Sequence, residues 1–139
     1  MSVMRRCLAV ALLAVVATGL AACSRDQEVK AAMAELDGFS DALVNKVKTA
    51  PNPSAGVDAA QKYLEANRGP LQQKLASIKD LRGFQVSEET RRKLEACFIN
   101  NATAVAGLQM DYVAQAAQDS DFNARLEKLV NDYKSAVTE

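Results

Sequence analysis

The chain of 139 residues contains no histidine and no tryptophan, and it has only three cysteines, three prolines and six glycines. Without histidine it lacks the usual general base near neutral pH and the commonest ligand of zinc, copper and haem iron. The same absence excludes catalytic cysteine–histidine pairs and c-type haem attachment. The net charge is zero, with 17 Lys and Arg against 17 Asp and Glu, so the basic surplus of a nucleic-acid-binding domain is missing. We therefore expect no nucleic-acid partner.

Motifs that carry enzyme chemistry are also missing from the sequence. It contains no Gly-rich phosphate loop, no nucleophile elbow and no Cys-x-x-Cys pair. Asp37 with Asp41, and Glu88 with Glu95, form carboxylate pairs of a kind that is ordinary on helix surfaces. A di-iron bundle would need Glu-x-x-His motifs, which require histidine. The sequence predicts a protein that is not an enzyme and that holds no metal or cofactor.

The first 22 residues differ in composition from the rest of the chain. Arg5 and Arg6 precede an uncharged stretch, 7–22, that is dominated by Leu, Ala and Val. This stretch is shorter than the roughly 20 residues that cross a bilayer as a helix. A short apolar core after two arginines, ending on small residues, is typical of a secretory signal peptide. The alternatives are an uncleaved membrane anchor and an ordinary cleavage site after Ala22.

The end of this stretch resembles the lipobox of bacterial lipoproteins. Leu20, Ala21 and Ala22 supply a branched residue and two small ones, and Cys23 follows directly. The resemblance implies that the Cys23 thiol receives diacylglycerol and that the chain is cleaved before this residue. The expected partner of the mature N-terminus is therefore a membrane, reached through the lipid on Cys23.

The resemblance also implies a location and a domain organisation. Ser24, next to the lipidated cysteine, resembles an outer-membrane sorting signal, so we expect an envelope lipoprotein on the outer membrane facing the periplasm. A Gram-positive cell membrane is the alternative. Residues 1–22 would be removed as the signal peptide, and residues 23–139 would form a single lipid-anchored domain. Helical periodicity begins within about three residues of Cys23, which leaves no long flexible linker.

The mature part has the periodicity of helices throughout. Apolar residues recur at spacings of three and four, and no run of alternating β-branched residues occurs. We expect an all-α fold, an antiparallel four-helix bundle. Gly69 and Pro70 leave two alternatives for the second rod, namely two segments at an angle or one rod kinked there. The predicted helices span about 25–49, 53–68 plus 70–82 as a kinked pair, 87–118 and 120–137.

The helix expected over 87–118 has the clearest start signal and carries a seam of apolar residues with one amide in it. Ser87 supplies a capping hydroxyl before two acidic residues. Because the helix over 120–137 spans only half its length, the long helix must either bend near Gly107 or project past the bundle. The seam consists of Leu94, Phe98, Asn101, Val105, Leu108 and Tyr112.

Within this helix the stretch 96–117 contains a single formal charge, Asp111. We interpret it as the central helix of the bundle, buried on most of its circumference. The alternative is a docking surface for another protein or a second copy, lined by Ala102, Ala104, Ala106 and Gly107.

Four residues of this helix are candidates for an interaction or interior polar site: Cys97, Asn101, Asp111 and Tyr112. After processing, Cys97 would be the only free thiol, which suggests either an intermolecular bridge or a small buried hydrophobe; we favour the second. Asn101 suggests a register-fixing polar contact, with a ligand cavity as the alternative. The triplet 91–93, Arg-Arg-Lys, predicts a solvated face with local ion pairs rather than a lipid-headgroup site.

Together these features predict a membrane-anchored envelope lipoprotein that acts as a non-enzymatic interaction or structural module. Its partner would be another envelope protein or a second copy of itself. The alternative is a carrier or sensor that binds a small apolar ligand or lipid in the bundle interior. A sealed apolar core favours the first function, whereas a cavity into which Asn101 or Tyr112 points favours the second.

Overall fold

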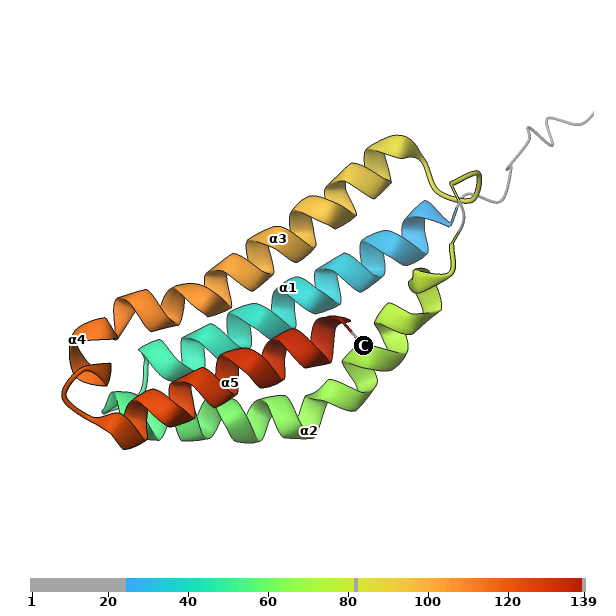
Figure 1. Ribbon diagram of the computed structural model, residues 1–139. Helices are drawn as coiled ribbons and strands as arrows, with labels where there is room; N and C mark the ends of the chain where they lie inside the picture. Colours follow the sequence, from blue (N-terminus) through green and yellow to red (C-terminus); the bar gives the residue numbers. More distant parts are fainter. Residues whose placement is uncertain (1–24, 82, 139) are drawn as a thin grey trace, which may run out of the picture.

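The prediction of an all-α helical bundle is confirmed by the computed structural model, which describes residues 25–81 and 83–138 (Figure 1). No strand occurs within these residues. The proposed signal peptide, Cys23 and Ser24 lie outside them. The helices are α1 (Asp26–Lys48), α2 (Pro53–Lys79), α3 (Glu88–Asp111), the single turn α4 (Val113–Ala116) and α5 (Ser120–Thr138).

The boundary between α1 and α2 follows from local chemistry. Acidic residues lie in the first turn of α1 and lysines in its last turn, as the helix dipole favours. The chain then reaches Pro51, which cannot donate a backbone hydrogen bond. Asn52 caps α2, because its side-chain oxygen accepts a hydrogen bond of 2.8 Å from the Ala55 N–H, and Pro53 takes the first helical position.

The second rod is one continuous helix, so the one-rod alternative holds. Pro70 lies inside α2, which ends at Lys79 rather than at residue 82. Figure 1 shows that α2 is bent along its length. Proline removes one backbone donor and crowds the preceding turn, and such a residue commonly bends a helix without ending it.

The helix predicted over 87–118 does not continue to residue 118, so its predicted end is wrong. Ser87 caps α3 as expected, with its hydroxyl oxygen accepting from the Thr90 N–H at 3.2 Å. The helix ends at Asp111, and Tyr112 leaves helical geometry with φ −113° and ψ 17°. The break therefore falls at Tyr112 and not near Gly107. The Tyr112 ring meets Phe122 of α5 edge-on at 5.9 Å, so packing against the returning helix coincides with the break.

Chain direction alternates from α1 to α2, α3 and α5, yet two of the helix pairs that touch run parallel. α1 contacts α2 and α3, while α5 contacts α2 and α3, so α2 and α3 lie diagonally opposite. An ion pair joins the helices of each parallel pair, α1 with α3 and α2 with α5. Lys48 and Asp111, at the last turns of α1 and α3, are 2.8 Å apart, and Arg125 of α5 lies 2.9 Å from Asp58 of α2.

The core is apolar and contains an aromatic group at its centre. Phe39 of α1 lies 5.3 Å from the ring of Tyr63 and 6.2 Å from that of Tyr133. Tyr133 is fully buried, and its hydroxyl lies 2.7 Å from that of Ser40. The side chains packed around this group are mostly leucines, valines and alanines contributed by α1, α2, α3 and α5. Burial of these apolar side chains supplies the main driving force for folding.

Candidate functional site

Helix α3 is not the central helix of the bundle, and this part of the sequence interpretation is wrong. Its buried residues within the described chain are confined to one side: Thr90, Cys97, Asn101, Val105 and Leu108. Figure 1 shows α3 along one edge of the molecule. The low charge of this helix therefore does not reflect burial all round, because apolar side chains also occupy its solvent side.

Two large apolar side chains are exposed on the solvent side of α3. Ile99 is 65% exposed and Met110 is 75% exposed, although large apolar side chains are usually buried. Thr103 and Ala106 lie between them at spacings of four, three and four residues, which places all four on one side of the helix. We call Ile99, Thr103, Ala106 and Met110 the outer α3 face. Val113 of α4 is also exposed, at 58%.

Of the small residues that the docking alternative named, Ala106 belongs to this face and the others lie around it. Ala104 is exposed, whereas Ala102, Ala106 and Gly107 are half-buried. The large residues Ile99 and Met110 carry most of the exposed apolar character. Sequence reasoning missed both, although their separation of 11 residues, close to three helical turns, was a signal for a shared side.

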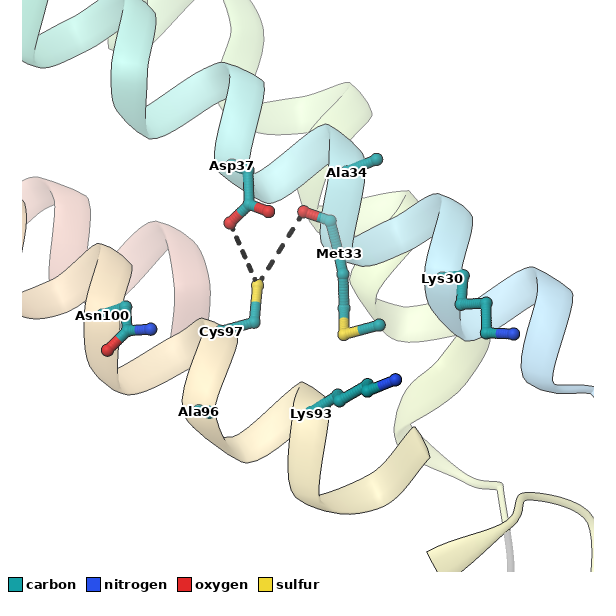
Figure 2. Close-up of a pocket in the computed structure, with 8 residues that line it drawn as sticks. All are labelled: Lys30, Met33, Ala34, Asp37, Lys93, Ala96, Cys97 and Asn100. Carbon is teal, nitrogen blue, oxygen red and sulfur yellow. Dashed lines mark hydrogen bonds between the residues drawn. The ribbon is translucent and has the colours of Figure 1, made fainter. Parts of the chain in front are cut away.

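Beside this face an open groove of about 430 Å³ lies between α1 and α3 at the surface (Figure 2). Asp37 and Met33 reach it from α1, and Cys97 forms its floor on α3. Two lysines stand at one end of the groove, Lys30 from α1 and Lys93 from α3. The groove lies at the junction of two helices near the surface and is not enclosed in the bundle interior.

Two of the lining residues, Asp37 and Cys97, form a polar cluster with the buried Asn101. The Asn101 amide nitrogen donates to Asp37 Oδ1 at 2.6 Å and to the Cys97 carbonyl at 2.8 Å. The Cys97 thiol lies 3.3 Å from the same carboxylate oxygen and 3.8 Å from the Met33 carbonyl. Asn101 is 7% exposed, so its amide donates inside the protein, once across to Asp37 of α1 and once back to its own helix. A buried amide that bonds across a helix pair favours one register of the two helices.

The thiol in this cluster is expected to be a poor nucleophile. Burial, together with the neighbouring Asp37 carboxylate, raises the pKa of Cys97 from its ordinary value of 9.0 to about 12. The thiolate is the nucleophilic form of cysteine, and it is scarce at neutral pH under these conditions. Cys97 is buried and makes no disulfide. The cluster thus provides packing and orientation and has no activated nucleophile.

The other two candidates, Asp111 and Tyr112, lie at the far end of α3. Asp111 is exposed and forms its ion pair with Lys48, while the half-buried Tyr112 contacts Phe122. Neither residue belongs to the Cys97 cluster, so the four candidate residues lie at two separate locations and do not form one site.

The predicted ion pairs at the start of α3 are confirmed. Arg91 and Arg92 lie 3.0 and 3.3 Å from Glu88, and Lys93 lies 2.6 Å from Glu89. Each cation of this triplet therefore has a carboxylate close by on its own helix.

Residues 25–81 and 83–138 contain no group of three or more Cys, Asp or Glu side chains placed to hold a metal ion. None of the helices in this range combines the length and the hydropathy that crossing a membrane requires.

Comparison of the chain with protein-family models, with curated proteins and with solved structures found no match.

Proposed function

We propose that this protein is a lipid-anchored envelope protein that acts as a non-enzymatic interaction module. The observation that carries the proposal is the sequence Leu20-Ala21-Ala22-Cys23 at the end of a short uncharged stretch that follows two arginines. Lipid on Cys23 would hold the bundle at a membrane, and Ser24 favours the outer membrane, facing the periplasm. A Gram-positive cell membrane is the alternative location.

The start of the folded part supports an anchor that holds the domain close. α1 begins at Asp26, and the backbone N–H of Arg25 already donates to the Gln85 carbonyl at 2.8 Å. Only Ser24 separates the proposed lipidated residue from this first tertiary hydrogen bond. Such a short connection favours a domain that works on partners near the membrane surface.

The outer α3 face supports an interaction role. Ile99 and Met110 present large apolar side chains to water on one side of a regular helix. Exposed apolar side chains that share one side of a helix can form the apolar part of a protein contact. The partner would be another envelope protein or a second copy of this chain.

The alternative function, a carrier for a small apolar ligand or lipid, has less support. The central side chains Tyr133, Phe122, Leu36, Leu64 and Leu108 are fully buried and pack on one another. Asn101 and Tyr112, which would line a ligand cavity, instead bond to Asp37 and pack on Phe122. The groove between α1 and α3 is open to solvent at its surface.

Replacement of the proposed lipid acceptor tests the anchor. The full chain is expressed in a bacterium that makes lipoproteins and is labelled with radioactive palmitate. We expect Cys23→Ser to lose the label and to leave the membrane fraction or accumulate unprocessed. The matched controls Cys7→Ser and Cys97→Ser keep the label and the membrane location. A Cys23→Ser protein that matures and fractionates like the parent would refute the proposal.

A photo-crosslinking residue on α3 tests the interaction role. Placed at Ile99 or Met110 in intact cells, it should give one adduct of defined mass, equal to twice the protein mass for self-association. The same residue at exposed Glu127 of α5 is the control and should give no such adduct. Identical patterns from all three positions would remove the outer α3 face from the proposal.

A further inference from the structure

The most exposed large apolar side chain of the described residues lies in neither the groove nor the outer α3 face. Phe84, in the connection between α2 and α3, is 85% exposed. Its neighbour Val86 is only 7% exposed and packs into the core, so the connection is fixed to the bundle while Phe84 points away from it. An exposed phenylalanine on a secured connection is a candidate for contact with an apolar phase.

Hydrogen bonds hold this connection against the start of α1. The Gln85 carbonyl accepts from the Arg25 N–H at 2.8 Å, and the Ser87 N–H donates to Asp26 Oδ1 at 2.8 Å. Phe84 is thus adjacent in sequence to the residue that receives the first backbone hydrogen bond of the folded chain. Figure 1 shows the connection and the start of α1 at the same end of the bundle.

The same end must lie close to the lipid anchor. Cys23 precedes Arg25 by two residues, and two extended residues span at most about 7 Å. A lipid on Cys23 therefore places the membrane surface within reach of the connection that carries Phe84.

We infer that Phe84 is a second membrane contact, which inserts into the interfacial region of the bilayer that holds the lipid of Cys23. The inference rests on the proposed anchor and adds an orientation to it. The bundle stands on the end formed by the start of α1 and the connection between α2 and α3. A lipid chain alone leaves a domain free to tilt, whereas a second apolar contact beside it restricts the tilt.

This orientation keeps the outer α3 face out of the membrane. Helix α3 starts next to the Phe84 connection and rises by 1.5 Å per residue, so Met110 lies about 33 Å along the helix from Glu88. Ile99 falls between these two heights. The face would project from the bilayer into the aqueous compartment, where a protein partner can reach it.

The contact would depend on the apolar ring and not on positive charge. Arg91, Arg92 and Lys93, which follow the connection in sequence, lie close to Glu88 and Glu89. Anionic lipid headgroups would meet no strong unpaired positive field from this triplet. Vesicles made of a zwitterionic lipid alone are therefore the right surface for the test.

The absence of tryptophan from the chain makes a direct test possible. Phe84→Trp introduces a single tryptophan at an exposed position, which is excited selectively at about 295 nm, where the tyrosines absorb little, and Ile99→Trp and Met110→Trp are matched exposed controls. Each full chain is purified in its processed form, and its mass is measured to establish diacylglycerol on Cys23. It is then incorporated into phosphatidylcholine vesicles with and without bromine on the acyl chains.

In the vesicles the tryptophan at position 84 should show a blue-shifted emission and lose most of its intensity when the lipid is brominated. The tryptophans at 99 and 110 should keep an aqueous emission and be quenched by acrylamide. If position 84 behaves like position 110 in a lipidated protein, the Phe84 contact is refuted and the anchor stands. If all three positions are quenched by brominated lipid, the bundle lies flat and the standing orientation is refuted. If Cys23 carries no lipid, the anchor and the Phe84 contact fall together.

Discussion

The hydroxyl groups of Ser40 in α1 and Tyr133 in α5 lie 2.7 Å apart at the centre of the bundle, where both side chains are buried. α1 and α5 are diagonally opposite, so this pair joins two helices that otherwise meet only across the core. The Ser40 hydroxyl also lies 2.9 Å from the Leu36 carbonyl, to which it donates. Tyr133 therefore donates to Ser40, and the Ser40 hydroxyl is the partner of both groups.

The two members of this pair should not be equivalent when they are replaced. Tyr133→Phe removes one hydrogen bond and leaves Ser40 bonded to Leu36, so it should lower the free energy of unfolding by about 1 kcal/mol. Ser40→Ala leaves the buried Tyr133 hydroxyl without an acceptor and should cost about 1 to 3 kcal/mol. Urea denaturation followed by circular dichroism measures both. A larger loss for Tyr133→Phe than for Ser40→Ala would contradict this assignment of donor and acceptor.

The cluster between α1 and α3 predicts a pH-dependent defect. Asn101→Asp replaces a donor by a carboxylate beside Asp37, whose oxygen lies 2.6 Å from the present amide nitrogen. We expect a loss of about 1 to 3 kcal/mol in the free energy of unfolding at pH 7. Burial and the like charge would raise the pKa of the new carboxyl, so much of the loss should disappear as the pH falls to 4 and the group takes up a proton.

Asn100→Asp is the matched control for this defect. Asn100 is the exposed neighbour of Asn101, and its replacement should change stability by less than about 0.5 kcal/mol at either pH. Equal effects of the two substitutions would show that the buried contact with Asp37 is unimportant.

Cys97 should react slowly in the folded protein. Its pKa of about 12 keeps the thiolate scarce, so alkylation by iodoacetamide at pH 8 should be slower than in urea by roughly a hundredfold or more. Mass spectrometry of the peptide that contains Cys97 measures the rate at this residue alone. Comparable rates in the folded and unfolded protein would contradict a buried, neutral thiol.

The same shift in pKa has a consequence for stability in alkali. The folded pKa lies above the ordinary value of 9.0, so the unfolded chain loses the Cys97 proton first as the pH rises. The stabilisation associated with the neutral thiol is therefore fully present below about pH 9 and is lost progressively towards pH 12. Burial also raises the pKa of Tyr133, which adds a loss of the same sign. The decline between pH 9 and 11 should be shallower in Cys97→Ala and in Tyr133→Phe than in the parent.

Two glycines should respond to alanine with opposite signs. A Cβ atom on Gly56 would lie 2.6 Å from the Val47 carbonyl oxygen and 2.9 Å from its Cα, so the backbones of α1 and α2 must separate. We expect Gly56→Ala to lower stability by about 1 to 3 kcal/mol. A Cβ atom on Gly107 meets nothing within 4 Å, and Gly107→Ala should raise stability by about 0.5 to 1 kcal/mol through the better helix propensity of alanine. Thermal unfolding of the two variants measures the contrast, and a shift of the same sign in both would contradict it.

The sequence by itself determined the helical class and most of the helix ends. Ser87 and Asn52 cap helices as their side chains allow, and Pro51 helps to end α1, because caps and prolines act through the backbone of their own neighbourhood. The apolar stripe of α1 was likewise readable, since its spacing follows the helical period.

Tertiary structure decided where α3 breaks, which of its sides is buried and which residues meet between helices. Nothing local to Tyr112 forbids helix, and the break there coincides with its packing on Phe122. Asp37 looked like half of an ordinary surface pair, yet it is the partner of Asn101 on another helix. The sequence did not indicate that Phe84 is exposed, because phenylalanine is usually buried in folded proteins. These features depend on contacts between residues far apart in the chain, and helical periodicity carries information only about near neighbours.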